Sequence, residues 1–278
     1  MSVAIGIAHA EWDHRRTAPL QRLMQQLDAV DGVNHVHVSC SPWREHAREW
    51  APRLWAWGAR QDASHIVFLN DDIRVCPEFV DACDAIASVL PNDVICMHTT
   101  LPEAAQLPIP FFRSYWVTGP AYMIPRHRLQ DLLVFAHEWS GLWESENEDG
   151  VAMQWLWHNQ TPACHTVPAL VVHDVEVPST LGYDHHPLRR ASVPWHSRPE
   201  IDVSRPGWWG SHFGGPLAEC PWRSVEAFKS IEMRRGRPPI CAFCATRRPV
   251  VQSVTGAGMC RDCLVECAKK ALGVSVHA

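Results

Sequence analysis

Residues 65–73 read HIVFLNDDI, a short apolar run that ends in one asparagine and two adjacent aspartates. A continuous apolar run of this length predicts a strand covered on both faces, as in a parallel sheet flanked by helices. Two interpretations of the polar end remain open. Asn70, Asp71 and Asp72 could form a solvated turn. They could also hold a divalent cation, because ligands of open α/β sheets bind beyond the carboxyl ends of the strands.

The segments on either side of this run alternate between strand and helix patterns. Before and just after it, strands are expected at 2–8, 32–38 and 93–98, with helices at 18–30, 43–60 and 77–90. Later in the chain, we expect strands on both sides of Gly119 within 115–125, helices at 126–138 and 151–159, and a strand at 163–173. This order predicts an α/β fold with a mostly parallel sheet flanked by helices.

Composition divides the 278-residue chain into an acidic body and a basic tail. Residues 223–278 carry ten Lys and Arg against four Asp and Glu, a charge of +6, whereas the whole chain carries −5, which leaves −11 on residues 1–222. No apolar run approaches the ~18 to 20 residues of a membrane span, and the N-terminus lacks signal-peptide features. We therefore expect a soluble cytoplasmic protein without a membrane partner, in the host cytoplasm if it is viral.

We expect three parts along the chain. Residues 1–222 form the α/β domain, 223–238 a linking helix and 239–278 a small module. Residues 178–222 are irregular and rich in Pro, Gly, Trp and His, and are expected to cover a substrate or wrap the surface. Trp195, Trp208 and Trp209 of this stretch are candidate acceptor contacts, since aromatic rings stack on sugars and bases. Most of the scattered cysteines outside the last module are expected to be buried thiols.

Four segments, in order over roughly residues 1–185, together resemble a glycosyltransferase of the GT-A fold, of the family-two-like kind. The segments are AIGIAHAEWDHRR (4–16), HIVFLNDDI (65–73), VTGPAYMIPRHRLQDLL (117–133), and the pair ENEDGVAMQWLW (146–157) and VPALVVHDVEVPSTLG (167–182). The resemblance implies metal-dependent transfer of a sugar from a nucleotide-sugar donor, with a UDP-sugar as the first candidate, and with inversion. Mn²⁺ or Mg²⁺ would be held at the donor diphosphate.

The resemblance also implies roles around the diphosphate. Asp72 would be the metal ligand and His173 would complete the metal site; the alternative for His173 is a histidine whose hydrogen bonds are satisfied at a strand end. Asp71 or Asn70 would face the ribose or the metal's water shell, although the family often has Asp where Asn70 stands. Arg16 would reach the donor nucleotide; the alternative, a surface arginine, is favoured by its sequence context alone.

The acidic stretch WESENEDG supplies the implied catalytic base. Asp149 is the first candidate, preceded by Glu148, with Glu144 and Glu146 as competitors. An ionised carboxylate near its ordinary pKa is expected to suffice, because the transition state acidifies the acceptor hydroxyl. The same acids also suit a helix N-terminus. Gly119 would permit close approach of the donor sugar; otherwise it is a turn glycine.

The C-terminal module contains a strong metal-binding pattern. Cys241 and Cys244 form one CxxC pair, Cys260 and Cys263 a second, and fifteen residues lie between the pairs. This spacing predicts a tetrahedral, four-thiolate structural Zn²⁺ site, whereas Cys267 is not expected to be a ligand. The stretch resembles the N-terminal zinc-binding domain of the ClpX-type unfoldase, which implies dimerisation or docking of a protein partner; contact with nucleic acid is a further alternative.

The acceptor is not specified by the sequence. A hydroxymethylated base in DNA, as would suit a phage enzyme, is one candidate, and a protein or glycan hydroxyl is another. The negative body weighs against DNA, whose binding normally requires a basic surface. Two other functions remain open: a degenerate, non-catalytic GT-A-like binding protein whose zinc module docks partners, and a nucleotidyltransferase on a related fold. The second is disfavoured because the Gly-rich, basic N-terminal loop of such enzymes is missing.

Overall fold

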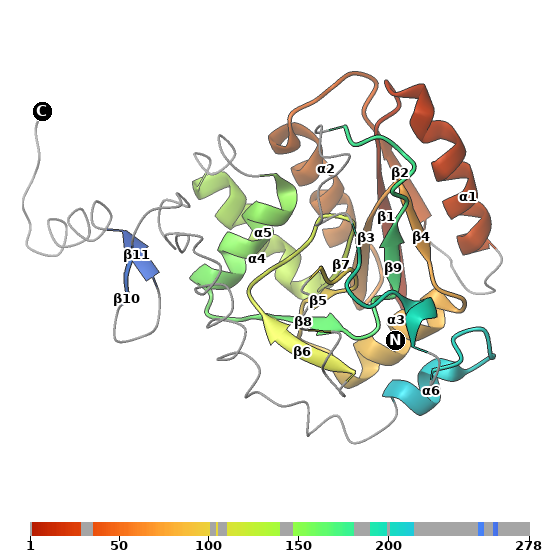
Figure 1. The fold of residues 1–278 in the computed structure, drawn as a ribbon. Helices are drawn as coiled ribbons and strands as arrows, with labels where there is room; N and C mark the ends of the chain where they lie inside the picture. The colour runs from red at the N-terminus through yellow and green to blue at the C-terminus, as the bar shows by residue number, and fades with distance from the viewer. Residues whose placement is uncertain are drawn as a thin grey trace, which may run out of the picture.

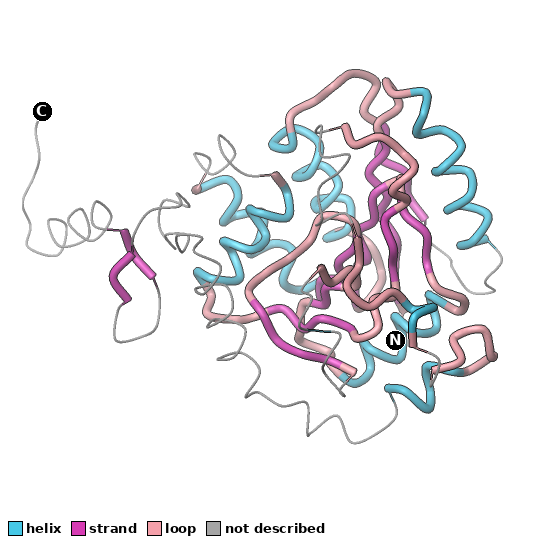
Figure 2. Tube along the Cα trace, viewed as in Figure 1, coloured by secondary structure: helices cyan, strands magenta, loops and turns pink. Residues whose placement is uncertain are grey.

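The computed structural model describes residues 2–28, 36–100, 104, 110–139, 147–180, 190–198, 201–213, 250–252 and 258–260. They build a seven-stranded sheet with helices on both of its faces (Figures 1 and 2). Its strands, given in spatial order, are β2 (Val36–Cys40), β1 (Val3–His9), β3 (His65–Asn70), β7 (Ala121–Pro125), β5 (Ile95–Cys96), β8 (Ala163–Thr166) and β6 (Phe111–Ser114). Two short strands, β4 (Ile73–Val75) and β9 (Val171–His173), pair separately.

The sheet is mixed, with most strands parallel. Strands β2, β1 and β3 run in one direction, and β5 and β8 share it. Strand β7 lies antiparallel between β3 and β5, and β6 lies antiparallel at the edge beside β8. The predicted α/β fold with a mostly parallel sheet flanked by helices is confirmed.

Helices cover both faces of the sheet and create two hydrophobic cores. Strand β3 feeds both, because successive side chains of a strand point to opposite faces: Val67 and Leu69 enter one core, Ile66 and Phe68 the other. The first core is covered by α1 (Thr17–Asp28) and α3 (Phe79–Val89). The second is covered by α2 (Ala47–Ala59), α4 (Arg126–Glu138) and α5 (Glu148–His158). The apolar run of β3 is therefore the centre of a three-layer domain.

Two sequence-based expectations about strands were wrong. The segment 163–173 is not one strand: β8 and β9 belong to different sheets, and Pro168 between them lacks the N–H that a continuous ladder requires. Upstream of Gly119, the strand is β6 rather than residues 115–118, so the expected Pro-rich loop ends earlier than predicted. Helix α6 (Trp208–Phe213) also lies in the stretch that was expected to be irregular.

The cysteine predictions divide by region. Cys76, Cys83, Cys96 and Cys164 are buried free thiols as expected, whereas Cys40 is exposed at the end of edge strand β2. In the predicted zinc module, β10 (Val250–Gln252) and β11 (Gly258–Cys260) pair antiparallel. The other predicted zinc ligands, Cys241, Cys244 and Cys263, lie outside the described residues, as does the predicted linking helix 223–238. The zinc site therefore stays a prediction. Among the described segments, none of the helices has the length and hydropathy needed to cross a bilayer.

Candidate functional site

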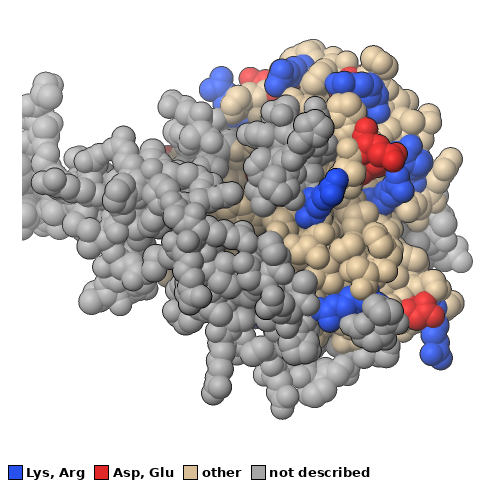
Figure 3. All heavy atoms as spheres, viewed as in Figure 1, with Lys and Arg blue, Asp and Glu red and all other residues tan. Residues whose placement is uncertain are grey.

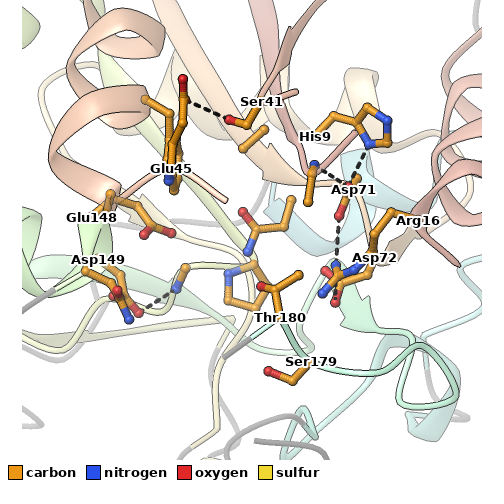
Figure 4. A pocket seen from close by; sticks show the side chains of 18 of the residues that line it. His9, Arg16, Ser41, Glu45, Asp71, Asp72, Glu148, Asp149, Ser179 and Thr180 are labelled. Atoms are coloured by element: carbon orange, nitrogen blue, oxygen red, sulfur yellow. Dashed lines mark hydrogen bonds and ion pairs between the residues drawn. The ribbon is translucent and has the colours of Figure 1, made fainter. Parts of the chain in front are cut away.

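A pocket of about 490 Å³ opens at the carboxyl ends of β1 and β3 (Figure 4). Most of the predicted donor and catalytic residues line it: Arg16, Asn70, Asp71, Asp72, Gly119, Glu148, Asp149 and His173. They come from segments up to 157 residues apart in the chain, counted from Arg16 to His173. Ligands of α/β sheets bind at this edge because several strands end there together. The pocket is therefore the candidate site.

Asp71 is fixed by three donors beneath the pocket. It is 2% exposed, and its Oδ2 lies 2.7 Å from Nδ1 of His9 and accepts the backbone N–H of Ala10 at 3.0 Å. Its Oδ1 accepts from Nη1 of Arg16 at 2.8 Å. His9 was not among the residues predicted from the sequence. The sequence did contain a signal for His9, because it directly follows the strand expected at 2–8, and neighbouring parallel strands end at the same edge of a sheet. In the structure Ala8 is the register partner of Asn70, which brings His9 to Asp71.

Asp72 lies between a guanidinium and an imidazole. Its Oδ2 is 2.7 Å from Nη1 of Arg16 and 2.6 Å from Nε2 of His173. Arg16 is only 4% exposed, so the surface-arginine interpretation was wrong. The same Nη1 thus contacts both aspartates, while Nη2 donates to the carbonyl of Pro178 at 3.1 Å. Arg16 holds the two carboxylates together and also contacts the segment that follows β9 (Figure 4).

His173 is positioned by the small β4–β9 sheet. Its register partner is Ile73, the residue directly after Asp72, and the N–H of Asp174 donates to the carbonyl of Asp72 at 2.8 Å. Asp174 in turn accepts from Arg22 at 2.8 Å and from Arg74 at 3.1 Å. The backbone after β3 and the end of β9 are therefore fastened side by side, which brings the Asp72 and His173 side chains together.

A second carboxyl pair lies across the pocket at the N-terminus of α5. Oδ2 of Asp149 accepts a hydrogen bond from the N–H of Gly119, and Oδ1 accepts one from the N–H of the neighbouring Gly150, both at 2.9 Å. Burial, followed by the adjacent Asp149 charge, raises the pKa of Glu148 to about 8. Burial also raises the pKa of Asp149, although its backbone hydrogen bonds oppose the shift. Both pKa values therefore lie above that of an ordinary solvated carboxyl group. Glu144 and Glu146 lie outside the described residues.

Gly119 connects the two groups of acids. The next residue, Pro120, accepts the N–H of Asn70 at 3.1 Å, so the turn that holds Asp149 also contacts the end of β3. A Cβ at position 119 would lie 2.9 Å from Oε1 of Glu148 and 3.4 Å from Oδ2 of Asp149. The absence of a side chain is therefore what allows both carboxyl groups to approach this turn.

Gly119→Ala is expected to displace the carboxyl pair and to lower kcat/KM by roughly 10- to 100-fold, since misplacement by about 1 Å costs up to that much. The matched control is Gly210→Ala in α6, where an added Cβ meets nothing within 4 Å. The measurement is kcat/KM for donor turnover together with Tm. Full activity in Gly119→Ala would contradict the tight packing seen at this turn.

Aromatic residues of the pocket differ from those predicted. Trp12, Trp50 and Trp116 line it, together with Arg44 and Glu45 from the segment after β2. The predicted acceptor contacts lie elsewhere: Trp208 is 3% exposed and packs in the first core, and Trp195 and Trp209 pack against it. Tryptophans spaced without a clear period gave no sequence signal to separate these two groups.

A divalent cation fits the Asp72–His173 pair in part. One carboxylate and one imidazole converge, an O/N combination that suits Mn²⁺ better than Mg²⁺. However, Arg16 already contacts the same Oδ2, and no three His, Cys, Asp or Glu side chains of the described segments are arranged as a metal site. A cation here would have to take Arg16's place and complete its coordination with water or phosphate oxygens.

Comparisons with known proteins gave structural likenesses alone. No family model matches the chain, and no curated protein does. Solved structures that resemble it include a glycosyltransferase involved in glycosylation of the PBCV-1 major capsid. The two chains share 15% sequence identity with a TM-score of 0.41, and the match covers 67% of this chain and 100% of that one. GalNAc-T7 with UDP, GalNAc and Mn²⁺ has 11% identity and TM-score 0.41, over 62% of this chain and 43% of that one. TarS residues 1–349 of S. aureus has 9% identity and TM-score 0.37, over 56% and 54%. Likenesses at this level assign no function, which must be inferred from the pocket.

Proposed function

We propose that the chain is a metal-dependent glycosyltransferase of the GT-A type that moves a sugar from a nucleoside diphosphate sugar to a hydroxyl group. One observation carries the proposal: the Asp71–Asp72–His173 group and the Glu148–Asp149 pair face one pocket and are joined through the Gly119–Pro120 turn. The first group suits a diphosphate with its cation and the second suits proton transfer. Sugar transfer needs both functions, with the diphosphate and its cation on one side of the anomeric carbon and the proton-accepting group on the other.

The charge of the first group supports a cation at the donor. Asp71, Asp72 and Arg16 together carry one net negative charge, which repels a diphosphate. Asp72 and His173 would hold a divalent cation, which supplies positive charge that stabilises the leaving diphosphate when it is bound. Arg16 and the end of β1 would then face the nucleotide side of the donor, and a UDP-sugar is the first donor to test.

The second group would handle the acceptor proton. Asp149 accepts two backbone N–H groups, which favours its ionised form, whereas the pKa of Glu148 is raised to about 8. We therefore take Asp149 as the carboxylate and Glu148 as the protonated partner. In an inverting transfer, the acceptor oxygen bonds to the anomeric carbon while the bond to the diphosphate oxygen breaks. The hydroxyl proton passes to Asp149. Glu148, as the protonated partner, can donate a hydrogen bond to the sugar.

The acceptor is proposed by class. A hydroxymethylated base in DNA remains the first to test, against protein and glycan hydroxyls. In the view of Figure 3, basic and acidic side chains lie side by side and no continuous basic face is seen among the described residues, which does not favour docking of duplex DNA on that face. The basic C-terminal module, with its predicted zinc, is the more suitable element for an anionic or protein partner.

A donor screen tests the proposal. UDP-, GDP- and dTDP-sugars are added with and without Mn²⁺, and Tm and release of the nucleoside diphosphate are measured. A donor at about 100 times its Kd adds about 2.7 kcal/mol, which raises Tm by roughly 5–10 °C for a domain of this size. Acceptor tests on hydroxymethylated and unmodified DNA follow. The proposal fails if no donor raises Tm and none is turned over.

The non-catalytic alternative is favoured by one observation: Arg16 contacts both aspartates and neutralises part of their charge. A binding protein would bind a nucleotide sugar but never release its diphosphate, with or without Mn²⁺. The same screen therefore separates the two functions, because Tm reports binding and diphosphate release reports turnover.

A further inference from the structure

Arg16 is a buried cation in the position where the proposed metal ion must act. Its Nη1 is 2.8 Å from Oδ1 of Asp71 and 2.7 Å from Oδ2 of Asp72. The side chains are 5%, 3% and 2% exposed, so water screens these contacts weakly. Guanidinium stays charged at all physiological pH values, so its charge must always be matched by partners.

A divalent cation at Asp72 cannot simply be added to this arrangement. It would compete with Nη1 of Arg16 for Oδ2 and would place like charges close together in a buried site. If Arg16 gave up Asp72 without a substitute, a buried charge would lose one of its two carboxylates. Breaking a buried ion pair by removing one partner is strongly unfavourable. Binding of the metal alone is therefore opposed by Arg16.

A diphosphate removes this opposition. Its anionic oxygens offer the planar guanidinium a paired, charge-assisted set of hydrogen bonds. Arg16 lines the same pocket as Asp72, and its guanidinium contacts both the acidic pair and the Pro178 carbonyl (Figure 4). Rotation of the guanidinium toward a diphosphate bound in this pocket would exchange a carboxylate for a phosphate as its partner.

We propose that Arg16 is a placeholder cation: it occupies the acidic pair until a nucleoside diphosphate arrives, then transfers to the phosphates and leaves Asp72 to the divalent ion. This inference rests on the proposed function. Its consequence is that metal and diphosphate bind with strong positive coupling, and that the metal alone binds weakly. Arg16 is then a positioning residue that makes metal uptake dependent on the donor.

The test measures Mn²⁺ binding by electron paramagnetic resonance, with and without saturating UDP, in the full chain. The variants are Arg16→Gln, which removes the charge, and Arg48→Gln in α2, an exposed arginine outside the pocket lining, as the matched control. Association of Mn²⁺ with UDP in solution is the same for every protein, so comparison at one UDP concentration cancels it.

In the wild type and in Arg48→Gln, UDP is expected to tighten Mn²⁺ binding by about 10- to 100-fold, within the usual range of coupling between sites. Arg16→Gln is expected to bind Mn²⁺ alone about 10-fold more tightly than the wild type, with coupling reduced to about 3-fold or less. Equal coupling in Arg16→Gln and the wild type, or no gain in binding of Mn²⁺ alone, overturns the inference.

A second comparison needs the wild type only, in case Arg16→Gln does not fold. Uridine replaces UDP, so the base and ribose are kept and the phosphates are removed. Binding is expressed against the free Mn²⁺ concentration, because UDP but not uridine associates with Mn²⁺ in solution. Coupling is then expected to disappear with uridine, and equal coupling with uridine and UDP overturns the inference. If neither Mn²⁺ nor UDP binds the wild type, the proposed function fails and takes the inference with it. If both bind without coupling, the inference alone fails.

Discussion

Asp72→Asn is expected to lower kcat/KM for nucleotide-sugar turnover by about 10³-fold or more, since it removes the proposed anchor of the cation that stabilises the leaving diphosphate. The side chain keeps its size and its buried position, so the loss reports charge rather than packing. Mn²⁺ binding in the presence of UDP is expected to weaken in parallel. The measurements are initial rates of diphosphate release over a range of Mn²⁺ concentrations and Mn²⁺ titration by electron paramagnetic resonance.

The matched control is Asp202→Asn, an exposed aspartate whose carboxylate interacts locally with Ser204 and Arg205. Asp72→Asn also removes one of the two carboxylates of buried Arg16, so it is expected to lower stability by roughly 1–3 kcal/mol. The activity assay is therefore run well below the variant's Tm. Retention of full activity by Asp72→Asn would remove Asp72 from the donor site.

The stretch 65–73 shows what sequence alone can and cannot predict about this site. Local patterns correctly predicted the strand, its burial and its polar end, because the apolar run and the aspartates that end it are adjacent in the chain. The partners of those aspartates were harder to predict. His9, Arg16 and His173 come from 55 to 101 residues away. The strand pairing and the turn after β1 bring them within hydrogen-bonding distance only in the folded chain.

The burial of charged side chains was the second feature of the site that could not be predicted from the sequence. Arg16 ends a short 3-10 turn (His14–Arg16) directly before α1. An arginine at such a position is normally solvated, and nothing next to it in the chain marks it as buried. Its burial depends on the simultaneous presence of two carboxylates and the Pro178 carbonyl, a balance that exists only in the folded chain. The same holds for the raised pKa of Glu148, which comes from burial among residues that the sequence does not place together.

The position of β7 in the sheet shows which part of the fold could not be predicted from the sequence. Alternating strands and helices predicted the parallel strands correctly, because each crossover helix returns the chain in the same direction. No local signal indicated that the chain would place β7 antiparallel between β3 and β5. That insertion brings Gly119 and Pro120 to the end of β3, and with them the second carboxyl pair.

The Glu148–Asp149 pair gives the second large effect. Asp149→Asn is expected to lower kcat by about 10²- to 10⁴-fold, the usual contribution of a general base. The introduced amide keeps one oxygen to accept a backbone N–H, so the turn at Gly119 is expected to persist. Glu148→Gln is expected to be milder, because glutamine can still donate a hydrogen bond as protonated Glu148 would. If Glu148→Gln is the more damaging of the two, their roles are reversed.

The pH dependence distinguishes the two acids further. The pKa of Glu148 is raised to about 8 by burial and by the Asp149 charge, so the wild-type rate is expected to fall as pH rises through about 8, where Glu148 loses its proton. The alkaline limb is expected to be absent from Glu148→Gln, which has no proton to lose there. An unchanged alkaline limb in Glu148→Gln would show that another group titrates.

The free energy of unfolding is also expected to depend on protonation of Glu148, and to fall as pH rises. Between the ordinary glutamate pKa of 4.5 and its folded value of about 8, the folded state binds the Glu148 proton more tightly than the unfolded state does. The stabilisation that this proton contributes is fully present below that window and is lost as pH rises through it. Urea unfolding of the wild type and Glu148→Gln from pH 5 to pH 9 measures the difference, in which titration of the groups that do not interact with Glu148 cancels. The wild type is expected to lose stability relative to Glu148→Gln over this range. A difference that stays constant with pH would mean that Glu148 is ionised at neutral pH, and the proton assignment within the pair would have to be reversed.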